Sequence, residues 1–155
     1  MIRMPMTGYA ESPYPVRADY ADLNKYEVVT RGEDVALIGV GNFAAMASDA
    51  AAMLAREGIR ATVVNPLYLS GLDTSLLDSL GKKHRLILTL EDGILAGGFG
   101  QKIAAYYGNH PAVRVRNYGL PKKFFNRYNP AELARKYHLT AEQIAADVLK
   151  ERRRL

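Results

Sequence analysis

Short apolar runs separated by helical patterns extend along most of the chain. The runs predict β-strands at residues 26–29, 35–40, 61–65, 86–90 and 113–117. Because strands alternate with helices, neighbouring strands are expected to run parallel, with helices on both faces of the sheet. We predict a three-layer α/β/α fold around a mixed, mostly parallel sheet of about five strands.

The first two predicted helices begin and end at residues that favour capping. Asn42 is expected to cap the first helix, and Gly58 is expected to end it in the left-handed conformation. Asp73 is expected to cap the second helix. The apolar stripe of the first helix comprises Phe43, Met46, Ala47, Ala50, Ala51 and Leu54.

Three further helices are predicted in the second half of the chain. Residues 99–107 form the third. Asn129 caps the fourth, with Pro130 at its first position. Thr140 and Gln143 form a capping box that opens the fifth, which carries an apolar face.

The first 25 residues show no lasting helical or strand period. Prolines and tyrosines recur there instead, at Pro5, Tyr9, Pro13, Tyr14, Pro15 and Tyr20. We interpret residues 1–25 as an extended linker that packs through its tyrosines, and residues 26–155 as one domain.

The composition is that of an ordinary soluble globular domain. The chain has 155 residues, of which 48% are hydrophobic and 24% charged, and it is long enough for one core. It contains no run of about 18 apolar residues, so no membrane span is expected, and its start does not resemble a signal peptide. With no cysteine, disulfides, thiol nucleophiles and thiolate metal sites are excluded. We expect a cytoplasmic protein.

The net charge of +5 does not by itself predict nucleic-acid binding. Much of it comes from the C-terminal basic cluster, which is typical of a solvated helix end. The cluster consists of Lys150, Arg152, Arg153 and Arg154. No helix elsewhere interleaves aromatic and arginine side chains, so nucleic acid is not an expected partner.

The first candidate site lies between the second predicted strand and the first helix. Gly39 and Gly41, followed by Ala44, match the G-x-G-x-x-A pattern of dinucleotide-binding loops. Such loops also need an acidic residue at the end of the next strand, where this chain has Asn65 followed by Pro66. The favoured interpretation is that the glycines allow the helix to pack closely on the strand.

The second candidate site follows the strand at residues 86–90. Glu91 and Asp92 could act as an acid–base pair or as ligands of a hard metal ion. Adjacent residues of a strand point in opposite directions, however. The favoured interpretation is that Glu91 accepts backbone hydrogen bonds from the glycine-rich loop. The glycines of that loop are Gly97, Gly98 and Gly100.

Histidine and serine add no further candidate site. His84, His110 and His138 are dispersed without metal-ligand spacing and are expected at the surface. No serine lies in a G-x-S-x-G nucleophile elbow. The sequence therefore assembles neither a catalytic centre nor a metal site by itself.

The sequence around Glu91 resembles the C-terminal domain of transketolases and of 2-oxoacid dehydrogenase β subunits. The strand ending at Glu91 and the glycine loop at 97–100 carry the resemblance, together with Asn65, Pro66 and Asp73 upstream. It covers about residues 26–150 and implies that the first strand runs antiparallel to its neighbour.

The second half narrows the resemblance to 1-deoxy-D-xylulose-5-phosphate synthase. The segments that carry this resemblance are residues 117–121, 124–125 and 139–144. Members of that family join pyruvate and glyceraldehyde 3-phosphate with loss of carbon dioxide, at the start of the non-mevalonate isoprenoid route. They are transferases that use thiamine diphosphate and magnesium.

In that family the cofactor, the metal and the catalytic residues come from two preceding domains. The resemblance thus implies no cofactor and no catalytic residue in this chain, whose first six residues look like the last strand of the preceding pyrimidine-binding domain. Arg3 matches the first arginine of the family's Arg-Tyr-Pro-Arg-Gly segment and is the candidate substrate-binding residue. Met6 replaces the second, and a thioether cannot grip phosphate as a guanidinium does, unless Arg17 substitutes.

The resemblance implies a structural role for this domain. It is expected to pack against the preceding domains and a second subunit of a homodimer. Three alternatives remain open at this point. They are the C-terminal domain of another transketolase or 2-oxoacid dehydrogenase β-type enzyme, a nucleotide-binding regulatory module built on residues 39–44, and one subunit of a split enzyme.

Overall fold

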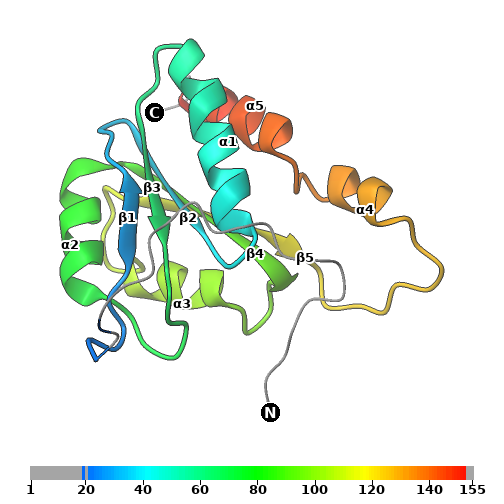
Figure 1. Ribbon diagram of the computed structural model, residues 1–155, viewed down its shortest axis with the longest axis horizontal. Coiled ribbons are helices and arrows are strands. Elements are labelled where there is room, and N and C mark those ends of the chain that lie inside the picture. Colours follow the sequence, from blue (N-terminus) through cyan, green and yellow to red (C-terminus); the bar gives the residue numbers. More distant parts are fainter. Residues whose placement is uncertain (1–18, 20, 153–155) are drawn as a thin grey trace.

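A five-stranded mixed sheet forms the centre of the molecule (Figure 1). The structure, a computed structural model, describes residue 19 and residues 21–152. The strands lie in the order β1–β3–β2–β4–β5. Their bounds are Glu27–Thr30 for β1, Val35–Gly39 for β2, Ala61–Asn65 for β3, Leu86–Ile94 for β4 and Arg114–Leu120 for β5.

All neighbouring strands are parallel except β1, which pairs antiparallel with β3. The predicted mixed, mostly parallel sheet is therefore confirmed, including its antiparallel first strand. β2 lies in the centre, and all its residues are buried. This explains why the sequence of β2 is an unbroken apolar run, since both of its faces are covered.

Helices cover both faces of the sheet. Their bounds are Phe43–Arg56 for α1, Thr74–Lys83 for α2, Phe99–Tyr106 for α3, Pro130–Lys136 for α4 and Ala141–Arg152 for α5. α1 and α5 pack on one face, whereas α2 and α3 pack on the other. α4 lies away from the sheet, at the end of the long connection from β5 (Figure 1). No helix in the described part of the chain is both long and apolar enough to cross a membrane.

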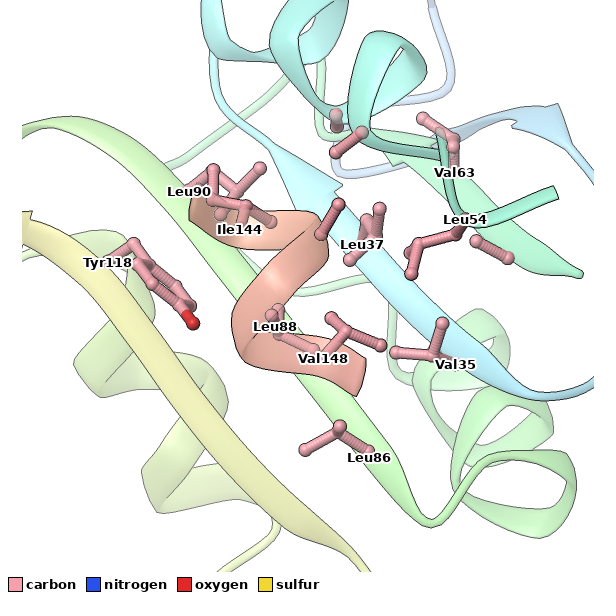
Figure 2. Packing of buried hydrophobic residues seen from close by; sticks show 14 of the residues in the cluster. Val35, Leu37, Leu54, Val63, Leu86, Leu88, Leu90, Tyr118, Ile144 and Val148 are labelled. Atoms are coloured by element: carbon pink, nitrogen blue, oxygen red, sulfur yellow. The ribbon is translucent and has the colours of Figure 1, made fainter. Parts of the chain in front are cut away.

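Alternate residues of each strand supply two separate cores. Val35 and Leu37 of β2 face α1 and α5, where Leu54 and Ile144 pack against them (Figure 2). The intervening β2 residues face α2 and α3 in the second core. Because side chains alternate along a strand, one apolar run can fill both layers.

The first helix ends as its sequence predicts but begins differently. Gly58 has a φ of 73°, and the amides of Gly58 and Ile59 close on the carbonyls of Ala55 and Leu54. This is the hydrogen-bond pattern of a Schellman motif. The capping prediction for Asn42 is wrong, because its backbone is already helical and its side chain makes no capping hydrogen bond.

Two strands extend beyond their predicted ends. β4 continues to Ile94 and β5 to Leu120, and these two residues pair with each other after a shift in register. The Leu95 amide also donates to the Leu120 carbonyl at 2.8 Å. The polar residues after Leu90 gave no strand pattern, so this pairing depends on the neighbouring chain rather than on local sequence.

Candidate functional site

Glu91 lies within β4, three residues before the last residue of the strand, and its side chain contacts the start of α3. Its carboxylate is buried and accepts hydrogen bonds from two backbone amides, Phe99 N at 2.9 Å and Gly100 N at 3.0 Å. These are the hydrogen bonds that the sequence predicted for this residue. They satisfy amides that a helix N-terminus leaves unpaired and place negative charge at the positive end of the helix dipole.

Two of the three loop glycines, Gly98 and Gly100, leave no room for a side chain. A Cβ on Gly98 would lie 2.6 Å from Glu91 Oε2, and one on Gly100 would lie 2.5 Å from Thr89 Oγ1. Gly97 instead needs its φ of 78°, which favours glycine. Glu91 and its glycines thus form one fixed connection between β4 and α3.

The acid–base interpretation of Glu91 and Asp92 finds no geometry to support it. Glu91 is buried against the helix, whereas Asp92 is exposed. Both oxygens of Glu91 are already engaged by backbone amides. The arrangement can hold a loop in shape, and it does not present two carboxylates to one reacting group.

Asp73 performs a similar task at the start of α2. Its Oδ1 accepts from the Leu76 amide at 3.1 Å, and its Oδ2 accepts from the Tyr26 amide at 3.1 Å, so it ties α2 to the residue before β1. Burial alone would raise the pKa of Asp73. The hydrogen bonds from Tyr26, Leu76 and Ser75, with the charge of Lys25, bring that pKa below its ordinary value.

Two further family-motif residues, Asn65 and Pro66, lie at the carboxyl end of β3. Asn65 is the last residue of β3 and pairs with Glu27 of β1. Pro66 follows it and is buried. Asn65 and Pro66 therefore lie on the path that leads from β3 to the Asp73 cap.

The Gly39–Ala44 turn shows why glycine is needed between β2 and α1. A Cβ on Gly39 would lie 2.3 Å from the Phe43 carbonyl oxygen and 2.7 Å from Ala44 Cα. Gly41 has a φ of 58° and open space around it. Gly39 is thus required because α1 packs closely on β2, and Gly41 is required because of its backbone conformation.

The expectation that all histidines lie at the surface is wrong for His84. Its side chain is buried, with Nε2 3.0 Å from Thr62 Oγ1 and Nδ1 3.1 Å from the Leu80 carbonyl. It joins the end of α2 to β3, and this contact between residues 22 apart has no local sequence signal. His110 and His138 are exposed, as expected.

Sequence reasoning missed a polar cluster centred on Asp147 of α5. Arg116 and Tyr118 of β5 and His138 all donate to its Oδ2. The alternation Arg116-x-Tyr118 could have placed these two side chains on one face of β5. Nothing in the sequence indicates their partner about thirty positions later.

The remaining sequence-predicted site residues precede the part of the chain that the structure describes. Arg3, Met6 and Arg17, with most of the predicted linker, lie outside the described residues. Within residues 21–152, no group of three or more histidine or carboxylate side chains could hold a metal ion.

Comparisons with known proteins point to one family. The family described as "Transketolase, C-terminal domain" matches residues 24–144. The 1-deoxy-D-xylulose-5-phosphate synthase of Symbiobacterium thermophilum is 38% identical over 124 residues, which are 79% of this chain and 19% of that protein. The synthase of Gloeothece citriformis is 37% identical over 129 residues, 83% of this chain and 20% of that protein. The chain thus spans about a fifth of the length of these relatives.

Solved structures agree on the fold. A split-gene transketolase, described as an inactive β4 tetramer, superimposes with a TM-score of 0.74 and 31% identity over 82% of this chain and 42% of that one. A Pichia stipitis transketolase in complex with sedoheptulose 7-phosphate gives a TM-score of 0.59 at 18% identity, over 82% of this chain and 18% of that one. At that identity the second likeness concerns the fold alone.

Proposed function

The chain belongs to the transketolase C-terminal domain family, and from this membership we propose that it is the assembly-supporting C-terminal domain of a 1-deoxy-D-xylulose-5-phosphate synthase-type enzyme. The observation that carries the proposal is the identity of 38% over 124 residues to a synthase of which these residues are only 19%. The parent enzyme would join pyruvate to glyceraldehyde 3-phosphate. This domain would contribute no catalytic residue.

The geometry of the family-motif residues Glu91 and Asp73 supports a scaffold role. Glu91 and Asp73 direct their carboxylate oxygens at backbone amides within the domain. A group whose hydrogen-bonding capacity is used internally fixes a loop rather than binding a substrate. Thiamine diphosphate and magnesium would accordingly be held by other parts of the parent enzyme.

Exposed apolar side chains support a role in assembly. Phe124 is 98% exposed, Leu23 66% and Tyr128 56%. Both faces of the sheet are already covered by helices, so these side chains lie outside the two cores. Phe124 and Tyr128 lie four residues apart on the connection between β5 and α4, and apolar groups gathered on one segment favour contact with another protein surface. We infer that they face the preceding domains and the second subunit of a homodimer.

A binding and turnover experiment tests the non-catalytic part of the proposal. The isolated chain is titrated with thiamine diphosphate and magnesium by calorimetry, then assayed for release of carbon dioxide from pyruvate. We expect neither heat of binding nor turnover, because the buried carboxylates of Glu91 and Asp73 are already engaged by backbone amides. Saturable cofactor binding accompanied by turnover contradicts the proposal.

A second candidate function is a subunit of a split transketolase. It is favoured by the likeness to the split-gene transketolase, at 31% identity and a TM-score of 0.74. The donor substrate separates the two candidates once the partner polypeptide is present. Carbon dioxide release from pyruvate supports the synthase, whereas consumption of xylulose 5-phosphate without carbon dioxide release supports the transketolase.

A further inference from the structure

The large apolar side chains that remain exposed gather at one end of the sheet. In the described part of the chain they are Leu23, Leu69, Ile94, Phe124 and Tyr128. One of them precedes β1, one follows β3, one ends β4, and two follow β5. Because β1 runs antiparallel to the other strands, all these positions lie at the carboxyl end of the sheet, where the parallel strands β2 to β5 finish.

Contacts between the connecting segments hold these side chains in a row across the sheet. On the β1 side, the Tyr26 hydroxyl donates to the Gly71 carbonyl at 3.2 Å and so joins the segment before β1 to the loop after β3. On the β5 side, Ile94 pairs with Leu120 at the end of β5. Neighbouring strands lie about 4.8 Å apart, so the row spans about 20 Å. A row of this length can lie within the surface that one partner contributes to a specific interface, about 800 Å².

The segment between β5 and α4 is braced in a way that leaves Phe124 in water. The neighbouring Phe125 ring lies 5.9 Å from the Tyr137 ring and 6.2 Å from the Tyr128 ring, in edge-to-face contacts. Lys123 Nζ lies 5.2 Å from the centre of the Phe125 ring. Phe124 itself is 98% exposed. An aromatic ring on a braced segment is suited to anchor an interface, since little conformational freedom is lost when it is covered.

The two sides of this row carry opposite charges. On the β1 side, Asp19 and Asp22 are exposed, whereas Lys25 is paired with Asp73. On the β5 side, residues 121–131 contain exposed cations and no carboxylate. The cations are Lys122, Lys123 and Arg127. A surface with an acidic side and a basic side is complementary to a second copy of itself after a half rotation.

The amino end of the sheet has a different character. In the part of the chain that the structure describes, it carries no exposed large apolar side chain. The turns that enter the parallel strands lie there, and α1 and α5 also end there (Figure 1). Its exposed basic side chains are Arg31, Arg56, Arg60, Lys82, Lys83, Arg85, Arg114, Lys150 and Arg152. Charged groups are costly to remove from water and are depleted at the centres of interfaces, so the carboxyl end is the better docking surface.

We propose that two copies of this chain associate through the carboxyl ends of their sheets, related by a twofold axis. The Asp22 side of one copy would face the Lys122 side of the other, and each apolar row would cover that of its partner. A twofold contact is closed, so association stops at the dimer. The inference rests on the assembly role proposed above, for which it names the surface and the partner.

The oligomeric state of the full chain tests the proposal. Sedimentation velocity is measured over a wide range of protein concentration, at low and at high sodium chloride. We expect a monomer–dimer equilibrium that shifts towards the monomer in high salt, because the opposite charges are then screened. A single monomeric species at every concentration overturns the proposal, and so does a series of species larger than the dimer. Either result leaves the proposed function to be judged by the assays of carbon dioxide release.

Phe124→Ala removes the proposed anchor and should leave the fold intact, since the side chain belongs to neither core. The dissociation constant of the dimer should rise at least about tenfold, because each dimer loses two anchors. His110→Ala is the control, since it removes an exposed ring between α3 and β5, at the amino end of the sheet. Equal dissociation constants of the two variants contradict the proposal.

Charge reversal tests the twofold pairing. Asp22→Lys and Lys122→Glu each place like charges opposite one another and should weaken the dimer. Combined in one chain, the two substitutions exchange the charges and should restore the association of the unmodified chain. A combined variant that associates no more tightly than either single variant overturns the twofold arrangement.

Discussion

Two buried carboxylates tie the starts of helices to the sheet. Glu91 binds the first amides of α3, and Asp73 binds an amide of α2 together with that of Tyr26. Each replaces water at groups that the helix itself leaves unpaired. Both carboxylates are expected to stabilise the fold. If one is removed, the buried backbone amide that donates to it has neither water nor a protein acceptor as a partner.

Replacing Glu91 by glutamine tests its internal role. The Glu91→Gln side chain keeps the size but directs an NH₂ group at one of the two backbone amides. We expect the free energy of unfolding to fall by about 2 kcal/mol in urea denaturation. Asp92→Asn serves as the control, since Asp92 is exposed and its change should stay within about 0.5 kcal/mol. Equal effects of the two substitutions contradict the role assigned to Glu91.

Asp73 should make stability depend on acidic pH. Its pKa in the folded protein lies below the ordinary value of 3.8, so its charged form stabilises the fold. This stabilisation is fully present above the pKa of the unfolded chain and is lost as pH falls through the folded pKa. Urea denaturation of the unmodified chain and of Asp73→Asn should therefore differ at neutral pH and converge in acid.

The control for Asp73 is an exposed aspartate on α1, which packs on the opposite face of the sheet from α2. Asp49→Asn on α1 changes the same formal charge without a buried hydrogen-bond network. Its stability should follow that of the unmodified chain at every pH. A pH-independent difference between the unmodified chain and Asp73→Asn would contradict the assigned role of the Asp73 charge.

The sequence predicted these local caps but not the contacts between distant segments. Asp73 and Glu91 are recognisable because a carboxylate beside a strand end or helix start has few other roles. The buried side chain of His84, by contrast, hydrogen-bonds to Thr62 of β3, and Asp147 accepts a hydrogen bond from Tyr118 of β5. Such pairings depend on how the chain folds back, and no spacing in the sequence encodes them.

At the scale of elements, the turn between β2 and α1 distinguishes two effects of glycine. Gly39→Ala would place its Cβ 2.3 Å from the Phe43 carbonyl oxygen, so strand and helix must separate. Gly41→Ala meets no atom but keeps a φ of 58° that alanine disfavours. We expect urea denaturation to give a loss of about 3 kcal/mol or more for Gly39→Ala, against about 1 kcal/mol for Gly41→Ala.

The test is whether Gly39→Ala lowers the free energy of unfolding more than Gly41→Ala does. A larger loss at Gly41 than at Gly39 would mean that backbone conformation, not close packing, requires glycine in this turn. The fold of each variant can be checked through the β2 and α1 amide signals. Only the Gly39 substitution should shift signals on both elements.

The bounds of helices and strands could be predicted from the sequence where a buried apolar run defines the element. The β3 prediction matches the observed strand, because its apolar run is bounded by Gly58 and Pro66. The ends of β4 and β5 were not predictable, since Ile94 and Leu120 pair only after a change of register. α4 has no buried residue, and its start was predicted from the Asn129 cap and from Pro130 at its first position.

At the scale of the whole molecule, the sheet is closed by helices on both faces, and its remaining contact surfaces are edges and loops. β1 and β5 form the two edges. The exposed Phe124 and Tyr128 follow β5, on the connection to α4 (Figure 1). The two cores lie within the domain, so the proposed contacts with partners would use its edges and loops.

The measurement that tests the proposed assembly role most directly is reconstitution. A polypeptide comprising the thiamine diphosphate-binding portion of the parent enzyme is assayed for release of carbon dioxide from pyruvate, alone and with this chain added. The proposed function predicts that the chain raises the activity and co-elutes with the larger polypeptide in size-exclusion chromatography. No gain in activity over the larger polypeptide alone, with the two eluting separately, would contradict it.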